Sequence, residues 1–277
     1  YCKLNKVKAI GLADSYNLCG ALEFAEKISK VGTQPIIGTQ INILNDNQIG
    51  KITLYATSEK GYKNLTKLSS LSYLKNKKLN DPYCEISDII DNNEDLILLT
   101  GNYSNFFGKL FQANKIKLFE KILEKLKFSF KDRLYIEIQR HSENQEFNYE
   151  NYLLKISSSH NLPLIASQEV YYLQPDMAEA HDALICIGEK KFIDDSSRFR
   201  YSDQHFIKNT DDLYKLYKDI PEALENNYNF PLRFSFKPKK SKPILPSISN
   251  NQDISPEQEL SVQAKKGLES RLKNFIF

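Results

Sequence analysis

The chain has 277 residues, of which 41% are hydrophobic and 26% are charged, and its formal net charge is +3. This length and composition support one large α/β domain, or a domain with an appendage. The small basic excess does not by itself argue for nucleic acid, and no apolar run approaches the roughly 18 residues of a membrane span. The four cysteines form no CxxC pair, so we expect reduced thiols in a cytoplasmic protein.

Short apolar runs alternate with segments of helical periodicity along the first two thirds of the chain. We predict strands over Lys8–Ala13, Pro35–Ile43, Lys51–Ala56, Leu96–Thr100, Leu134–Ile138 and Leu162–Ala166. Amphipathic helices are predicted between them, over residues 21–28 with an end at Gly32, around Leu65 and Leu68, over residues 116–126, and over residues 149–156.

Alternation of this kind favours parallel strands joined by crossover helices. Six such strands suit an α/β barrel of seven or eight. Because a barrel of this kind carries its functional groups on the loops after its strands, we inspect the positions that follow them: Asp14, Gln40, Gly101 and Glu169.

The composition changes near the C-terminal end. Prolines and lysines crowd residues 229–254, which predicts an extended linker. Ser255 and Pro256 then form a helix-start signal, so we expect a helix from there toward Phe277, at the beginning of a further domain over residues 255–277. The barrel domain is expected over residues 1–228.

Several segments, in order, resemble one family. They are ADSYNLCGALEF at 13–24, QPIIG at 34–38, GYKNLTKLSS at 61–70, EAHD at 179–182, FIDD at 192–195, SDQHF at 202–206 and IPEALEN at 220–226. The set is similar to the N-terminal PHP (polymerase and histidinol phosphatase) domain of the C-family replicative DNA polymerases of bacteria.

The resemblance implies a distorted seven-stranded (β/α) barrel followed by the palm of a polymerase. The first strand of the family, with its His-x-His motif, is expected upstream of Tyr1, and the catalytic aspartates of the palm beyond Phe277. The resemblance therefore implies no polymerase catalytic residue within this segment, and Mg²⁺ in the palm of the full-length protein.

Members of the family that act as phosphoesterases hold two or three metal ions with His, Asp, Glu and Cys ligands. Carried over position by position, the resemblance implies that this set is degenerate here. Two carboxylates remain, Asp14 and Glu169. The other positions carry residues that are poor ligands or repel a cation: Ser15, Gln40, Lys51, Asn102 and Tyr171. We therefore expect this segment to bind no catalytic metal.

Some features have a plain structural interpretation as well as a functional one. His181 is favoured as a helix residue rather than a ligand, and His141 is either a residue of the barrel mouth or a solvated loop residue. The basic tract from Lys237 to Lys242 is either a solvated linker or a contact for phosphates. Arg198 to Tyr201 pairs arginine with aromatics, but the segment matches a structural loop of the family.

Two functions from different classes remain. In the first, the segment is a scaffold that stabilises a polymerase and docks a separate proofreading exonuclease, with other replisome subunits and DNA as partners of the full-length protein. In the second, it is a metal-dependent phosphoesterase or proofreading nuclease, which the residues at 15, 40, 51 and 171 disfavour.

Overall fold

In the computed structural model, residues 1–74, 81–143, 145–243 and 254–274 are described. They form two compact units, Tyr1–Lys239 and Lys240–Phe277. The strands are β1 (Ala9–Ser15), β2 (Gln34–Asn45), β3 (Gln48–Ala56), β4 (Tyr83–Glu85), β5 (Leu96–Leu99), β6 (Leu134–Gln139) and β7 (Leu164–Ser167).

The helices of the first unit are α1 (Ala21–Lys30), α2 (Glu59–Leu74), α3 (Ile86–Asp91), α4 (Phe106–Gln112), α5 (Ile116–Phe130), α6 (Glu146–His160), α7 (Ala178–Glu189), α8 (Thr210–Tyr217) and α9 (Pro221–Asn229). Short 3-10 turns lie at Lys131–Arg133, Pro175–Met177 and Phe230–Arg233. The second unit contains α10 (Pro256–Asn274), and the backbone N–H of Gln258 donates to the Ser255 hydroxyl, as the helix-start signal predicted.

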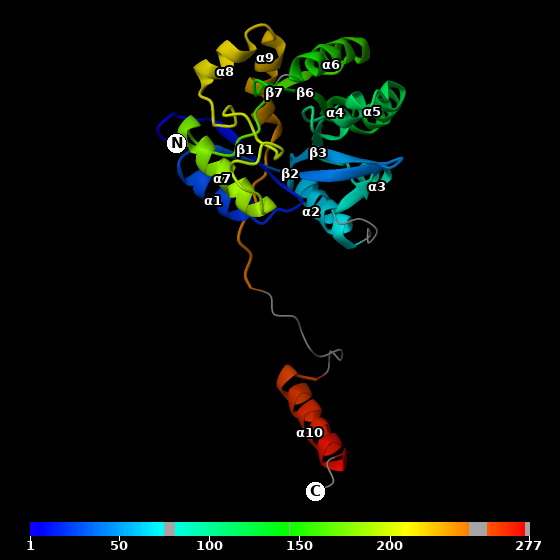
Figure 1. Ribbon diagram of the computed structural model, residues 1–277. Helices are drawn as coiled ribbons and strands as arrows, with labels where there is room; N and C mark the ends of the chain where they lie inside the picture. The colour runs from blue at the N-terminus through cyan, green and yellow to red at the C-terminus, as the bar shows by residue number, and fades with distance from the viewer. Residues whose placement is uncertain (75–80, 144, 244–253, 275–277) are drawn as a thin grey trace. The chain divides into compact units, whose positions relative to one another are not determined.

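The seven strands form one sheet. Six of them follow the order β1-β2-β3-β5-β6-β7, and the seventh, β4, pairs with β2. Figure 1 shows the sheet with its helices around it. The α/β barrel-like fold and all six predicted strands are confirmed. The three-residue strand β4 was not predicted, because it is too short to show a period.

The prediction of parallel strands is wrong for β3, which pairs antiparallel with both β2 and β5. The cause is the tight turn after Asn45. Asp46 and Asn47 have φ angles of 45° and 64°, and Asn45 faces Gln48 across the hairpin. Two residues with positive φ make the turn that matches the twist of a hairpin, so no crossover helix is needed here.

Alternation along the strands divides the core into two layers. In β5, Leu96 and Leu98 belong to the large outer layer under the helices, whereas Ile97 and Leu99 face the inside of the curled sheet. The inner layer contains Ile36, Ile97, Leu99, Tyr135 and Ile165, and it is completed by Phe230 and Phe234.

Phe230 and Phe234 explain why the first unit continues beyond residue 229, where we expected the linker to start. Both are buried, at 8% and 6% exposed, and both pack edge-on against Tyr55. The chain therefore stays on the barrel through Lys239. Residues 244–253 of the expected linker lie outside the described residues. Among the helices that are described, none is long and apolar enough to cross a membrane.

Candidate functional site

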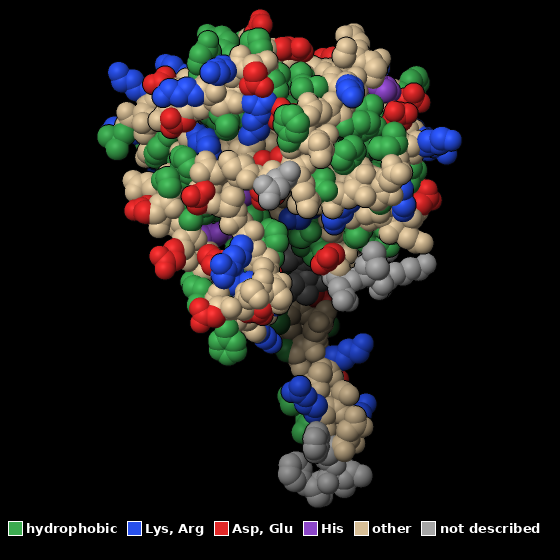
Figure 2. All heavy atoms as spheres, turned by 45° about the horizontal axis from the view of Figure 1, so that its top comes forward, with side chains coloured by type: hydrophobic (Ala, Val, Ile, Leu, Met, Phe, Trp, Pro, Cys, Tyr) green, Lys and Arg blue, Asp and Glu red, His purple; other side chains and the backbone are tan. Residues whose placement is uncertain are grey.

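A polar cavity of about 240 Å³ lies at the end of the curled sheet where the strands deliver their C-terminal residues. We call it the mouth cavity. Its lining is rich in amides, charged groups and aromatic rings: Tyr16, Asn42, Lys51, Asp81, Asn102, Tyr103, Ser104, Asn105, Lys109, His141, Glu143, Glu146, Glu169, Phe199, Tyr201 and His205, with Ile49. Figure 2 shows one face of the molecule, on which acidic and basic side chains are interspersed with no large area of one sign.

The β2–β3 hairpin brings a lysine to the cavity. The Lys51 ammonium donates to the Ser15 hydroxyl at 2.9 Å, and that hydroxyl donates to Gln40 Oε1 at 3.0 Å. Lys51 Nζ also lies 5.3 Å from the centre of the Tyr16 ring. Burial lowers the pKa of Lys51, and the nearby carboxylate of Glu169 partly opposes that effect. Three positions that the resemblance assigns to metal ligands thus form a hydrogen-bonded chain of their own.

Glu169 and Asn102 form a second polar contact in the mouth cavity. Asn102 Nδ2 lies 3.2 Å from Glu169 Oε2 and 3.1 Å from Gln139 Oε1, so the amide acts as a donor to both. A metal ligand must offer a lone pair instead. Asn102 therefore satisfies the remaining carboxylate in the way that a cation otherwise would.

Asp14 is not brought to the cavity with the other sequence-predicted residues. It neighbours Ser15 in β1, and successive side chains of a strand point to opposite faces. A Cβ built on Gly20 would lie 3.1 Å from Asp14 Oδ2, which places this carboxylate beside the start of α1. Of the two acidic residues that the sequence singled out, only Glu169 lines the mouth cavity.

Tyr171 lies at the rim, inside an aromatic cluster. Its ring stacks on His181, with centroids 4.9 Å apart, and its hydroxyl donates to the hydroxyl of Tyr201 at 3.1 Å. Burial raises the pKa of Tyr171, with a contribution from the carboxylate of Glu169, so the phenol stays neutral. His181 lies in α7, the helix in which the sequence predicted a structural residue.

Two histidines that sequence reasoning did not assign are stacked at the inner wall. His141 and His205 are 1% and 2% exposed, and their rings are parallel within 3° with centroids 4.1 Å apart. A backbone bridge between Tyr172 and Phe206 brings His205 alongside the segment after β7. His141 was visible in the sequence as a histidine after a strand, whereas this long-range bridge left no local signal.

Hydrogen bonds occupy three of the four imidazole nitrogens. His141 Nε2 accepts from the Glu169 backbone N–H at 3.2 Å, which places its proton on Nδ1, 3.2 Å from Glu146 Oε1. His205 Nδ1 donates to the Glu169 carbonyl at 2.9 Å. His205 Nε2 has no hydrogen-bond partner among the described residues and lies 4.0 Å from Glu143 Oε1. The pair therefore fixes the backbone of Glu169 from both sides.

Glu137 is a further buried carboxylate that the sequence did not single out. It is 4% exposed on the inner face of β6, and it accepts from Gly101 N at 2.9 Å, from Gln139 Nε2 at 2.9 Å and from the Ser167 hydroxyl. Burial raises its pKa despite these donors. The sequence did contain a signal for Glu137: it is an acidic residue within a mainly apolar strand, at an alternate position to its neighbours Ile136 and Ile138.

The donor set does not fit a multinuclear metal centre. An ammonium enters the cavity, Asn102 presents N–H groups, and Asp14 faces elsewhere. Within the described part of the chain, no three His, Cys, Asp or Glu side chains are grouped so that they could hold a metal ion.

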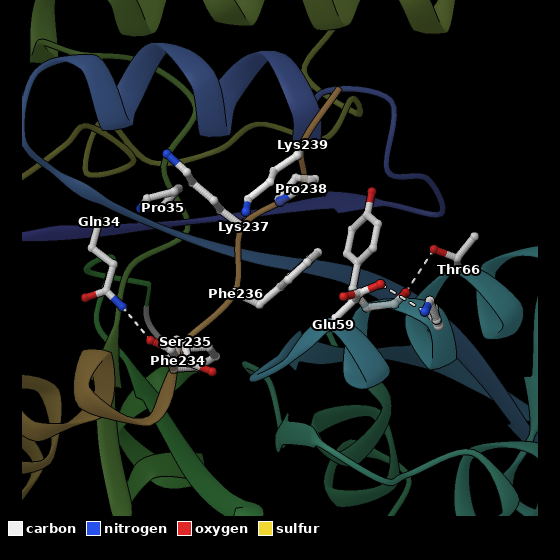
Figure 3. A pocket seen from close by; sticks show the side chains of 12 residues that line it. Gln34, Pro35, Glu59, Thr66, Phe234, Ser235, Phe236, Lys237, Pro238 and Lys239 are labelled. Atoms are coloured by element: carbon white, nitrogen blue, oxygen red, sulfur yellow. Dashed lines mark hydrogen bonds and ion pairs between the residues drawn. The ribbon is translucent and has the colours of Figure 1, made fainter. Parts of the chain in front are cut away.

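A second depression, of about 890 Å³, lies where residues 234–239 cross β2 and α2 (Figure 3). Gln34 Nε2 holds this segment by donating to the carbonyls of Pro231 and Phe234 at 3.0 and 2.9 Å. Lys237 and Lys239 of the predicted basic tract line it. It is an open groove beside the extended segment 234–239, and none of its lining residues is a buried polar group that lacks a partner.

Comparisons with known proteins agree with the resemblance. The PHP domain family matches residues 1–141. The chain is 35% identical over 276 residues to a DNA polymerase III subunit alpha of Caulobacter vibrioides, 35% over 268 residues to that of Rickettsia bellii, and 31% over 281 residues to that of Haemophilus influenzae.

These alignments cover 97%, 96% and 100% of this chain but 24%, 23% and 24% of the three relatives, so the chain spans about a quarter of their length. A solved structure described as a candidate metal-dependent phosphoesterase of Bifidobacterium adolescentis has a TM-score of 0.39 and 11% identity, over 60% of this chain and 78% of that one. That similarity is too low to bear on function. The match over residues 1–141 places this chain in the PHP domain family.

Proposed function

We propose that this chain is the N-terminal region of a cytoplasmic replicative DNA polymerase alpha subunit, and that its PHP domain is a scaffold without metal-dependent chemistry. The alignment of nearly the whole chain with the first quarter of such subunits supports the first half of this proposal. DNA synthesis, with Mg²⁺ in the palm, would then belong to the polypeptide beyond residue 277.

The observation that carries the second half is the position of Lys51. Its ammonium reaches the mouth cavity at 2.9 Å from Ser15 and near the carboxylate of Glu169. A positive charge there repels a divalent ion, and it attracts the Glu169 carboxylate that a metal would need as a ligand.

A scaffold of this kind leaves proofreading to another protein, so we propose a separate exonuclease subunit as its partner, within an assembly that also contains other replisome subunits and DNA. A metal-dependent phosphoesterase is the weaker alternative. Its support is limited to Glu169 and the two histidines of the mouth cavity, whose ring nitrogens are mostly occupied.

The test uses the full-length polypeptide. We expect primer extension with Mg²⁺ that stops when the ion is chelated. We expect no hydrolysis of bis-p-nitrophenyl phosphate above the buffer rate when Mn²⁺ or Zn²⁺ is added. Metal-dependent hydrolysis by a preparation free of contaminating nuclease would overturn the scaffold proposal. Failure of the exonuclease subunit to co-elute at micromolar concentration would count against docking.

A further inference from the structure

One side of α7 presents large apolar side chains to solvent. Leu184 is 64% exposed and Ile187 is 75% exposed, and Met177, directly before the helix, is 44% exposed. Positions 177, 184 and 187 are separated by seven and three residues, so they lie along one stripe of the helix. Phe192, which is 84% exposed, follows soon after the C-terminal end. We call these four residues the α7 outer face.

The opposite side of α7 is fixed to the first unit. Asp182 forms an ion pair with Arg198, whose side chain is 1% exposed, and Cys186 is buried. His181, beside the outer face, stacks its ring on Tyr171. The ion pair of Asp182 and the burial of Cys186 on this side, together with the ring stack of His181, prevent the helix from rotating about its axis. The outer face therefore cannot turn inward to bury its own side chains.

Exposure on this scale marks an interaction surface. A single exposed leucine is ordinary, but a stripe of large apolar residues with no charged residue at its positions 177, 184 and 187 is not. A mainly apolar surface is typical of a permanent contact, whereas interfaces that form and dissociate are more polar.

We propose that the α7 outer face is covered, in the full-length protein, by an apolar surface of the same polypeptide from beyond residue 277. The inference rests on the proposed function, and it uses the fact that the relatives are about four times as long as this chain. A stripe on a 12-residue helix is too small to supply by itself the roughly 1,200–2,000 Å² that a stable dimer needs. The geometry suits a helix or groove that is held close by covalent connection.

Cysteine labelling of the full-length protein tests this. Leu184→Cys and Ile187→Cys place a thiol on the outer face, and Tyr228→Cys on α9 and Phe128→Cys on α5 are matched controls at positions 82% and 86% exposed. The labelling rate of each site, read from its own peptide by mass spectrometry, is divided by its rate in denaturant. We expect labelling at 184 and 187 to be slowed at least about tenfold more than at the control sites.

Equal labelling at all four sites would overturn the proposal. So would protection that appears only at concentrations where the protein dimerises, which would indicate a second copy, or only after other replisome subunits are added, which would indicate a separate partner. Primer extension by the same preparation reports on the proposed function independently. A polymerase that synthesises DNA while 184 and 187 label freely would refute the docking alone.

Discussion

Arg140 connects three elements at the edge of the mouth cavity, and its removal gives a prediction with a defined size. Its Nε and Nη2 donate to the Glu150 carboxylate at 2.8 and 2.5 Å, and its Nη1 and Nη2 donate to Asp219 at 2.7 Å each. The guanidinium also lies 5.1 Å from the centre of the Tyr217 ring. The end of β6, α6 and the segment after α8 are thereby tied together.

The two carboxylates contribute unequally because their exposure differs. The side chain of Glu150 is 13% exposed and that of Asp219 is 58% exposed. Arg140→Met leaves Glu150 as a mostly buried charge without its partner, which costs about 3 kcal/mol, the low end of the range for a fully buried pair. Loss of the exposed pair to Asp219 adds at most about 1 kcal/mol, and loss of the contact with Tyr217 about as much.

We therefore expect Arg140→Met to lower the unfolding free energy by roughly 4 kcal/mol, which corresponds to a fall in melting temperature on the order of 10 °C. Because the chain has no tryptophan, far-UV circular dichroism is the suitable assay. Asp219→Asn is the matched control and should cost under about 1 kcal/mol. The double variant Arg140→Met with Glu150→Gln should recover much of the loss. Equal, small costs for Arg140→Met and Asp219→Asn would refute the reasoning.

Two further predictions concern the inner layer. In Gly38→Ala the new Cβ would lie 2.5 Å from both the Leu54 carbonyl oxygen and the Tyr55 ring. We therefore expect the unfolding free energy to fall by about 1–3 kcal/mol and the melting temperature to fall by several degrees. An unchanged melting curve would contradict this prediction. Burial raises the pKa of Glu137 from 4.5, so the folded state binds its proton more tightly than the unfolded state does. The unfolding free energy of the unsubstituted protein, relative to that of Glu137→Gln, should therefore fall as pH rises above about 4.5. Denaturant titrations that show a rise instead would disprove the raised pKa of Glu137.

The sequence predicted the strands well because each is a compact apolar run with a clear boundary. It did not predict the direction of β3, since a hairpin and a crossover differ only in the turn, and Asp46-Asn47 was not recognised as a turn of positive φ. Phe230 and Phe234 were assigned to a linker because of the neighbouring prolines, although their rings complete the inner layer. Local composition was outweighed by a tertiary contact with Tyr55.

At the site, adjacency in sequence was a poor guide to adjacency in space. Asp14 and Ser15 were inspected as one motif, yet strand alternation sends them to opposite faces, and only Ser15 joins the chain with Lys51. Conversely, His205 reaches Glu169 across 36 positions through a backbone bridge. The alternation of side chains along a strand could have excluded Asp14 from the mouth cavity in advance. No pattern in the sequence predicts the bridge between Tyr172 and Phe206.

The charge of Lys51 also bears on the loss of metal ligands that the resemblance implies. A divalent ion placed about 4 Å from an ammonium is repelled by about 8 kcal/mol at an effective dielectric of 20, twice the value for two unit charges. Lysine at position 51 therefore disfavours a metal ion close to its ammonium. A histidine restored at position 171 would leave this ammonium in place, where it donates to Ser15. Ser15, Gln40 and Asn102 each form a hydrogen bond at this end of the sheet, so none of these polar side chains is left without a partner.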